Sequence, residues 1–232
     1  MVVNLVQQLL ERSEVSRVLV TLNVPEVLSF PDDSRIQLIY NDEPLGFGAN
    51  HNAAFQHGKS PYFCVLNPDI ELKLNPFAAL LADLQENCVG LCAPLVTDEN
   101  SVVEDSARRF LTPWRMVLRK AGLFNGAYRV VLGGGQIYPD WIAGMFMLFD
   151  AEAFRKVGGF DTAYFMYCED ADICTRLWQS GYQVVLDSGV SVVHRAQRAS
   201  RRSATHLRWH MGSMVRYFFR YWGRLPRTAP PL

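Results

Sequence analysis

Short apolar runs alternate with amphipathic segments over the first hundred residues, and this alternation constrains the fold more than any other feature. Four apolar runs are predicted to be strands: residues 15–22, 36–40, 62–66 and 88–96. Three segments are predicted to be helices: residues 4–12, 46–57 and 75–86, the last with Pro76 at its first helical position. Such alternation is typical of α/β proteins. We therefore predict a mostly parallel central sheet with helices on both faces.

The rest of the chain is less regular. Residues 97–140 are predicted to form a mobile excursion that contains a helix near residues 113–121. Beyond it, periodicity predicts a strand at 141–149, helices at 151–157 and 170–180, strands at 182–186 and 190–193, and a last helix at 203–222. The sequence shows no repeat and no linker, so we predict one domain spanning residues 1–232.

The formal net charge of zero conceals an uneven distribution. All 23 acidic residues lie before residue 188, whereas residues 195–232 contain nine arginines and no acidic residue. A basic end on an acidic body indicates contact with something anionic: a membrane surface, a nucleic acid or the body itself. No nucleic-acid-binding motif accompanies the arginines, so we expect no nucleic acid partner.

Composition narrows the class of protein. Apolar residues make up 49% of the chain, which excludes a disordered protein and allows a sizeable core. No apolar run is long enough for a transmembrane helix, and no basic segment indicates a secretory signal. The five cysteines include no C-x-x-C pair, so they favour neither a disulfide framework nor a zinc site. We expect a cytoplasmic protein.

Two polar segments lie at strand ends or strand-to-helix turns, where α/β proteins bind ligands. Gly46 and Gly48 open a predicted helix, and glycines there let backbone N–H groups approach a phosphate or a sugar. A simple tight turn is the alternative. Asp69, in Asn67-Pro68-Asp69, follows an apolar strand, and a carboxylate there is able to hold Mg²⁺ or Mn²⁺. The alternative is again a turn, because all three residue types favour turns.

Acidic and imidazole side chains mark two further positions. Glu169, Asp170 and Asp172 cluster where an apolar stretch becomes a helix. They supply either a general base on a rigid helix start or charges that complement the helix dipole. His194 follows the predicted strand 190–193 and is either a metal ligand or a structural histidine.

Taken in order, six segments resemble the family 2 glycosyltransferases, especially the bacterial rhamnosyltransferase-like branch. The segments are Gly46–Asn52, Leu66–Asp69, Trp141–Met147, Val157–Asp161, Phe165–Leu177 and His194. The resemblance covers about residues 15–222. It implies a GT-A fold, a nucleotide-diphosphate sugar donor, a divalent metal ion (Mg²⁺ or Mn²⁺) and inversion at the anomeric carbon.

The resemblance also implies roles for single residues. Asp69 stands in the place of the family's D-x-D motif and His194 matches a later histidine, so both are expected to bind the metal ion. Asp170, with Glu169 beside it, matches the acidic pair that supplies the catalytic base. Six residues are expected on the donor side: Asn23, Gly46, Gly48, Asn52, Asn67 and Gly144.

Two departures from the family pattern concern the nucleotide. Family members begin with a strand that ends in a Thr-Tyr-Asn-like motif, whereas this sequence starts at the helix expected after it. The next strand ends in Thr21-Leu22-Asn23 instead of Val-Asp-Asn, so the acid that usually contacts the base is missing. Absence of the first strand is expected to leave an exposed sheet edge.

The expected function is sugar transfer, with rhamnose favoured by the resemblance, to a glycan hydroxyl in bacterial surface polysaccharide synthesis. The two departures favour an alternative, a catalytically silent GT-A-like binding protein. Nucleotide binding separates these hypotheses. A sugar-nucleotide pyrophosphorylase is a further class, but it needs a glycine-rich loop with a basic residue, and nothing before Gly46 supplies one.

The predicted last helix combines apolar residues at helical spacing with arginines. The apolar positions are Leu207, Met211, Met214, Val215, Phe218 and Trp222. The arginines are Arg201, Arg202, Arg208, Arg216, Arg220, Arg224 and Arg227. Either the helix packs on the core and pairs with the acidic body, or it lies on an anionic membrane surface. The second hypothesis predicts peripheral attachment to the inner face of the cell membrane, where the resembling family often finds lipid-linked glycan acceptors.

Overall fold

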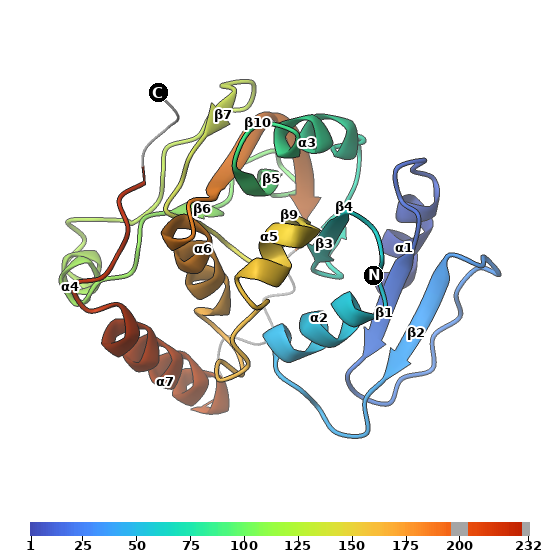
Figure 1. Ribbon diagram of the computed structural model, residues 1–232, viewed down its shortest axis with the longest axis horizontal. Helices are drawn as coiled ribbons and strands as arrows, with labels where there is room; N and C mark the ends of the chain where they lie inside the picture. The colour runs from blue at the N-terminus through green and yellow to red at the C-terminus, as the bar shows by residue number, and fades with distance from the viewer. Residues whose placement is uncertain (196–203, 229–232) are drawn as a thin grey trace.

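The computed structural model describes residues 1–195 and 204–228 (Figure 1). The helices are α1 Val2–Leu10, α2 Phe47–Gln56, α3 Phe77–Leu84, α4 Pro113–Lys120, α5 Ala151–Lys156, α6 Glu169–Gln179 and α7 Ala204–Tyr221. The strands are β1 Val18–Leu22, β2 Ile36–Tyr40, β3 Tyr62–Leu66, β4 Ile70–Glu71, β5 Val89–Thr97, β6 Ala107–Arg108, β7 Gln136–Ile137, β8 Trp141–Ile142, β9 Phe146–Asp150 and β10 Gln183–His194. Arg201 and Arg202, predicted to belong to the last helix region, lie outside the described residues.

A six-stranded sheet forms the centre of the molecule, in the order β3-β9-β5-β10-β4, with β7 also pairing with β10. β5 and β10 pair in parallel. The pairs β3–β9, β5–β9, β10–β4 and β10–β7 are antiparallel. The α/β class is therefore confirmed, but the sheet is mixed and not mostly parallel. The reason is that β9 inserts between β3 and β5 in the opposite direction, while two short strands run back along β10.

The central strands are buried on both faces, and their alternating side chains divide the core in two. Along β5, Leu91, Ala93 and Leu95 belong to one cluster, whereas Cys92 and Val96 belong to the other. Helices α5, α6 and α7 contribute to the first cluster, and α1 and α3 contribute to the second. Helices thus cover both faces, as predicted. All nine residues of β5 are buried, which explains its continuous apolar sequence.

The strand predicted at residues 141–149 and the helix predicted at residues 75–86 both differ in detail from the structure. The predicted strand 141–149 is split into β8 and β9, because the residues between them leave the sheet. There the Ala143 N–H donates to the Ser106 carbonyl at 2.8 Å. Pro76 lies at the N-cap of α3, one residue before the first helical position.

The predicted strands 182–186 and 190–193 form one strand, β10. Its pairing with β5 shifts register between Asp187 and Ser191. The intervening residues form an irregularity whose backbone bonds to the loop before β7. The chain continues in the same direction through this irregularity, so the two predicted strands are one.

Residues 97–140 contain the predicted helix, α4, and two short strands. Pro113 opens the helix, and the Thr112 side chain caps it by accepting from the Arg115 N–H. β6 pairs with β8, and β7 pairs with β10. The N–H of buried Phe110 donates to Asp140 at 2.7 Å. The excursion is thus attached to the core at several points, and its mobility stays a prediction.

β1 and β2 form a separate parallel pair beside the central sheet (Figure 1). Within the described residues, β1 pairs only with β2, and β3 pairs only with β9. A cavity of about 1160 Å³ is lined by residues of both β1 and β3, and apolar residues of α1 and of these two strands contribute to its walls. The exposed sheet edge expected from the sequence is therefore present on each side of this cavity.

We expect β1 and β2 to open more readily than the central sheet. A two-stranded sheet is only marginally stable by itself, and this pair borders a cavity instead of a third strand. In hydrogen–deuterium exchange, amides of β1 and β2 should exchange at least about tenfold faster than those of β5 and β10. Equal protection in the two sheets would contradict this prediction.

Candidate active site

Segments from distant parts of the chain meet at one end of the central sheet. β3 and β9 pair so that the end of β3 meets the start of β9. Just beyond β3, the Asn67 N–H donates to the Met145 carbonyl at 2.9 Å. Gly144, the residue before Met145, donates its N–H to Asp170 Oδ2 at 3.1 Å. The turn after β3, the break between β8 and β9, and the start of α6 therefore lie side by side.

His194, the last residue of β10, reaches the same turn because β10 pairs with β4. Its Nε2 lies 3.1 Å from Asp69 Oδ2, and its Nδ1 lies 2.7 Å from Glu104 Oε2. Glu104 reaches the ring because its segment folds back on β5, where the Glu104 N–H donates to the Val96 carbonyl. Hydrogen bonds to Asp69 and then Glu104 raise the pKa of His194 to about 9, so the ring is protonated at neutral pH.

Asp69 and His194 fit the predicted role of metal ligands. Their facing atoms are 3.1 Å apart, and neighbouring ligands of an octahedral ion at about 2.1 Å lie about 3 Å apart. Asp69 Oδ1 is buried and has no hydrogen-bond partner among the described residues, so it is available to a cation. Glu104 would hold the histidine ring in position, and a bound ion would displace the ring proton.

These two side chains do not form a complete cage. Among residues 1–195 and 204–228, no group of three or more His, Cys, Asp or Glu side chains is placed to hold a metal ion. Mg²⁺ and similar ions commonly use one or two carboxylates and take other ligands from substrate phosphates and water. The pair therefore suits an ion that binds together with a diphosphate.

Asp170 begins α6 with its carboxylate held by two backbone groups. Its Oδ1 accepts from the Ala171 N–H at 2.8 Å, and its Oδ2 accepts from Gly144. Burial nevertheless raises the pKa of Asp170. Dipole complementarity alone would lower that pKa, so the environment favours a base. A Cβ on Gly144 would lie 3.7 Å from Asp170 Cβ and 3.2 Å from the Phe47 ring, so the predicted Gly144 does lie beside the predicted base.

Glu169, next to Asp170 at the start of α6, is buried. It is only 6% exposed, and its Oε2 has no hydrogen-bond partner in the described part of the chain. Burial, followed by the negative charge of Asp170, raises the pKa of Glu169. The two carboxyl groups therefore share a site that disfavours two negative charges.

The loop before α6 is strained and is braced by α7. Tyr167 and Cys168 have positive φ angles of 74° and 65°, which cost about 1–3 kcal/mol each outside glycine. The Ser213 hydroxyl of α7 donates to the Met166 carbonyl at 2.8 Å, and the Tyr167 hydroxyl bonds to His206 Nδ1 at 2.9 Å. This brace determines where α6, and therefore Asp170, begins.

Three predicted donor-side residues join α2 to the loop before α6. A Cβ on Gly46 would lie 2.5 Å from the Phe165 carbonyl oxygen, and one on Gly48 would lie 2.6 Å from Phe160 Cβ. The Asn52 side chain accepts from the Phe160 N–H at 2.9 Å and donates to its carbonyl at 2.8 Å. The structure thus gives these residues a positioning role, and their contact with the donor stays a prediction.

Asn23 and Asn67, the remaining predicted donor-side residues, line the cavity between β1 and β3. Asn23 is held by the Leu45 backbone, whose N–H donates to its Oδ1 at 2.8 Å. Asn50 and His51 also line the cavity, and burial lowers the pKa of His51 to about 4, so the ring is neutral. A cavity that combines apolar walls with a few polar groups has the character of a small-molecule site.

Comparison with other sequences assigns the family. A sequence profile described as "Glycosyl transferase family group 2" matches residues 73–229. The chain is also 31% identical over 191 residues to rhamnosyltransferase WbbL of Escherichia coli (strain K12), a match that covers 75% of this chain and 70% of that protein. The chain belongs to glycosyltransferase family group 2.

A second relative of this glycosyltransferase is N-acetylglucosaminyl-diphospho-decaprenol L-rhamnosyltransferase of Mycobacterium tuberculosis (strain ATCC 25618 / H37Rv). It is 31% identical over 166 residues, which cover 63% of this chain and about half, 51%, of that protein. Both relatives are rhamnosyltransferases by name, in agreement with the branch that the sequence motifs indicated.

Solved structures confirm the GT-A fold of this glycosyltransferase. GalNAc-T7, crystallised with UDP, GalNAc and Mn²⁺, superposes with a TM-score of 0.69 at 15% identity, covering 94% of this chain and 44% of that one. The mannosyltransferase PcManGT from Pyrobaculum calidifontis, in complex with GDP-Man and Mn²⁺, gives a TM-score of 0.60 at 16% identity, covering 99% and 62%. At these identities the likeness concerns the fold alone.

Sequence reasoning missed Glu104, although a local signal was available. Asp98 follows β5 in a polar turn, where its side chain accepts from the Asn100 and Val102 N–H groups. A tight turn directly after a strand returns the chain to the end of that strand. The carboxylate of Glu104 was therefore a candidate for the same end of the sheet as His194.

The buried Glu169 predicts a pH dependence of folding. Because its pKa is raised above the usual 4.5 in the folded chain, the unfolded chain loses this proton first as the pH rises. The free energy of unfolding should therefore fall from about pH 4.5 upward, by at most about 1.4 kcal/mol per pH unit. In Glu169→Gln this slope should be smaller, as measured by urea denaturation between pH 5 and 8. The exposed Glu152→Gln is the matched control, and an unchanged slope in Glu169→Gln would contradict the prediction.

Proposed function

We propose that this glycosyltransferase moves a sugar from a nucleotide-diphosphate donor to a glycan hydroxyl with inversion at the anomeric carbon. One observation carries the proposal: two hydrogen bonds join Asp170 to the turn that bears Asp69, one from the Gly144 N–H to Asp170 and one from the Asn67 N–H to the Met145 carbonyl. His194, at the end of β10, contacts Asp69, and burial raises the pKa of Asp170. A base and a site for a diphosphate-bound cation are the two parts that a single displacement needs.

In the proposed reaction Asp170 accepts the proton of the acceptor hydroxyl. The oxygen attacks the anomeric carbon, and the bond to the diphosphate breaks on the opposite face. A carboxylate held by Gly144 and Ala171 needs little reorganisation, and its raised pKa makes it a stronger base once ionised. Asp69 and His194 would hold a divalent ion, which neutralises the charge of the leaving diphosphate when bound.

The names of the relatives favour rhamnose as the sugar and a lipid-linked glycan as the acceptor. A catalytically silent binding protein is the second candidate function. The separate β1–β2 pair favours it, because the cavity beside Asn23 lies where a nucleotide is expected and has two unpaired sheet edges. Calorimetry with nucleoside diphosphates and Mn²⁺ distinguishes an active enzyme, which must bind a nucleotide, from a silent relative that does not.

Replacing the proposed base is the direct test of turnover. Asp170→Asn keeps the shape of the side chain but removes the proton acceptor, so sugar transfer should fall about 10²–10⁴-fold while nucleotide binding persists. Turnover is measured with radiolabelled dTDP-rhamnose and a glycosyl-diphospho-lipid acceptor. If the variant loses thermal stability but keeps its turnover, Asp170 only stabilises the start of α6 through the helix dipole and is not the base.

We further propose that α7 attaches the enzyme to an anionic membrane surface at the inner face of the cell membrane. The inner face of α7 packs on the core through Ser213, Tyr217 and Tyr221. Arg220 pairs with Asp161 and Asp172. The first alternative from the sequence is therefore correct for this face of the helix.

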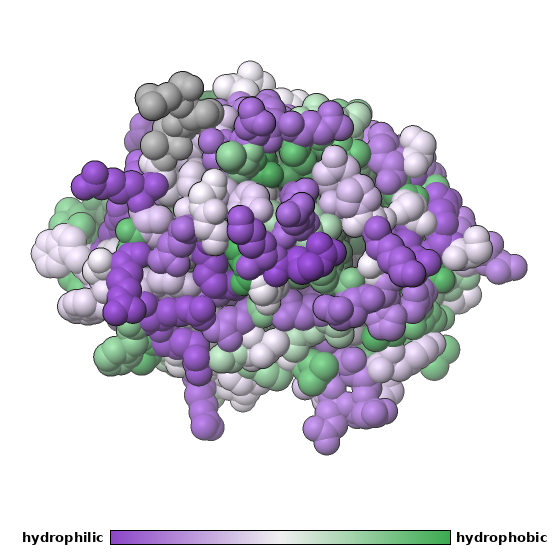
Figure 2. All heavy atoms as spheres, in the orientation of Figure 1, coloured by the Kyte–Doolittle hydropathy of each residue, from purple (hydrophilic) through white to green (hydrophobic). Residues whose placement is uncertain are grey.

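The outer face of α7 has a different character. Its large apolar side chains are exposed: Leu207, Met211, Val215, Phe219 and Trp222. Two predicted members of the apolar stripe, Met214 and Phe218, instead pack partly against the core. Figure 2 shows apolar and strongly polar side chains side by side over α7, at the lower left of the view. No helix in the described ranges is long and apolar enough to cross a membrane.

The charge of this face supports an anionic surface as its partner. Arg208, Arg216, Arg224 and Arg227 are exposed on or just after α7, and no acidic residue follows Asp187 in the sequence. Each basic residue near an anionic bilayer contributes about 1 kcal/mol, and exposed aromatic side chains insert at the interface.

Vesicle co-sedimentation tests this attachment. The protein should bind vesicles that contain phosphatidylglycerol, bind phosphatidylcholine vesicles far less, and be released by salt. The double variant Phe219→Ser, Trp222→Ser should bind less, whereas Tyr40→Ser, an equally exposed aromatic on β2, should not change binding. Equal binding to both lipids, or to neither, would refute the proposal.

A further inference from the structure

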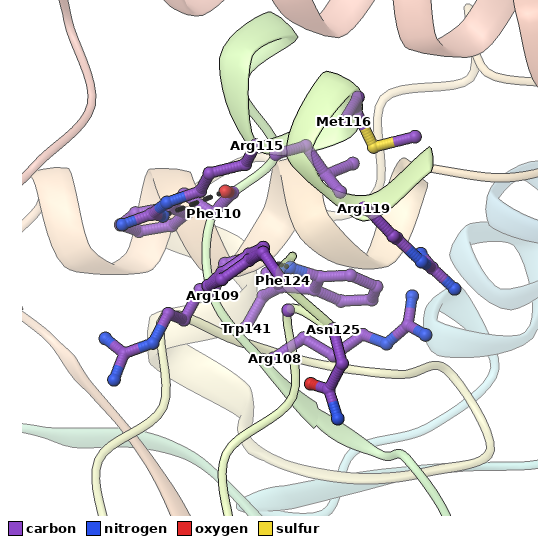
Figure 3. A pocket seen from close by; sticks show the side chains of 11 residues that line it. Arg108, Arg109, Phe110, Arg115, Met116, Arg119, Phe124, Asn125 and Trp141 are labelled. Carbon is purple, nitrogen blue, oxygen red and sulfur yellow. Dashed lines mark hydrogen bonds between the residues drawn. The ribbon is translucent and has the colours of Figure 1, made fainter. Parts of the chain in front are cut away.

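An arginine-rich pocket lies between α4 and the β6–β8 pair, and the function proposed above does not use it. Arg108, Arg109, Arg115 and Arg119 line it together with Trp141, and its lining contains no acidic residue (Figure 3). All four arginines come from the 97–140 excursion. The depression is shallow, with a volume of about 20 Å³, so a ligand would lie across its mouth. Guanidinium groups there suit a phosphate-bearing ligand, because the planar fork of arginine binds phosphate oxygens in pairs.

Only part of this positive charge is neutralised within the chain. Arg108 pairs with Asp105, and Arg115 pairs with Asp140 at 3.5 Å. Arg109 lies over the Tyr128 ring, 4.6 Å from its centroid. Within residues 1–195 and 204–228, neither Arg109 nor Arg119 has an ion-pair partner.

Two of the four arginines, Arg108 and Arg119, are placed to bind one ligand together. Figure 3 shows the guanidinium groups of Arg108 and Arg119 turned toward each other on one side of Trp141, whereas Arg109 and Arg115 point to the other side. Arg108 is already paired with Asp105, whereas Arg119 has no ion-pair partner in the described part of the chain, so an anion between the two groups would compensate the charge of Arg119. Arg108 is also fixed in place, because it pairs with Trp141 in the β6–β8 ladder and lies over the indole ring.

The position of this pair connects the reaction centre with α7. Burial raises the pKa of Asp170, and the charge of Arg108 acts against that rise, so the two groups are close in space. Burial lowers the pKa of His210 on α7, and the charge of Arg119 lowers it further. Arg108 also pairs with Trp141 on β8, and Ala143, the residue that follows β8, precedes Gly144, which donates to Asp170. An anion held by Arg108 and Arg119 would therefore be near both the base and α7.

We propose that Arg108 and Arg119 bind the diphosphate of a lipid-linked acceptor. This inference rests on the proposed function, since it places the acceptor sugar at Asp170 and its lipid toward α7. Asp69 and His194 are assigned to the donor diphosphate at another edge of the site. The two diphosphates thus have separate cationic partners: a metal ion for the leaving group and arginines for the group that stays intact.

Inorganic pyrophosphate is the probe for this pocket, measured by calorimetry in EDTA so that no metal ion contributes. Arg119→Ala should weaken pyrophosphate binding about tenfold, because a charge-assisted hydrogen bond is lost. Lys120→Ala, which removes the same charge from the next residue of α4, should change binding less than about twofold. Equal losses in the two variants would overturn the proposal, because they would indicate a diffuse charge effect. Pyrophosphate binding needs no turnover, so it tests the pocket even if sugar transfer fails.

Kinetics distinguish the source of the diphosphate. Arg119→Ala should raise KM for a glycosyl-diphospho-lipid acceptor by a similar factor and leave KM for the nucleotide sugar unchanged. A raised KM for the nucleotide sugar would show that the pocket serves the donor and would overturn the proposal. A loss of vesicle binding with an unchanged acceptor KM would assign the pocket to phospholipid headgroups and would overturn it as well.

Discussion

The parallel pairing of β5 with β10 is the interaction on which the rest of the structure depends. All of β5 is buried, and in β10 Val184, Val185, Leu186, Val192 and Val193 are buried, so their pairing divides the core into two clusters and gives helices a surface on either side. The pairing places Val193 opposite Thr97, so β10 ends where β5 ends. His194 consequently meets Glu104, which returns from the turn after β5, and Asp69, which precedes β4. The proposed metal site is a direct result of this register.

Helix α7 serves the candidate site from outside the sheet. The Tyr217 hydroxyl bonds to Thr175, and the Tyr221 hydroxyl donates to Asp172, both at 2.7 Å and both on α6. The same helix holds the strained loop that precedes Asp170. The position of the base is therefore coupled to a helix whose outer face is apolar and basic, and attachment of that face to a membrane would leave these inner contacts intact.

Local patterns in the sequence were sufficient for the α/β fold class and for placing candidate residues at strand ends. Asp69, Asp170 and His194 could be singled out because each follows or begins a recognisable element, and the structure brings them to one end of the sheet. Their catalytic roles remain a proposal. The direction of β9 was not predictable, since its insertion between β3 and β5 depends on packing between segments far apart in the chain. A periodic pattern gives the length of a strand but not its partner.

The contacts of single polar residues were equally beyond the reach of the sequence. The hydrogen bonds of Asn52 to the backbone of Phe160, 108 residues away, were not predicted, and its contact with the donor stays a prediction. The inner face of α7 is made largely by Tyr217 and Tyr221, whose hydroxyl groups find buried partners and which the predicted apolar stripe did not include. In both cases the deciding interaction is a long-range hydrogen bond, which leaves no periodic signal.

The central claim is that the Asp69–His194 pair and Asp170 belong to one reaction centre. Anomalous diffraction at the manganese edge, from crystals grown with Mn²⁺ and a nucleoside diphosphate, tests it most directly. The account predicts a manganese peak within coordination distance of Asp69 and His194, with the diphosphate bound to the ion on the side that faces Asp170. A peak at the α6 carboxylates instead, or a bound nucleotide with no metal at Asp69, would contradict it.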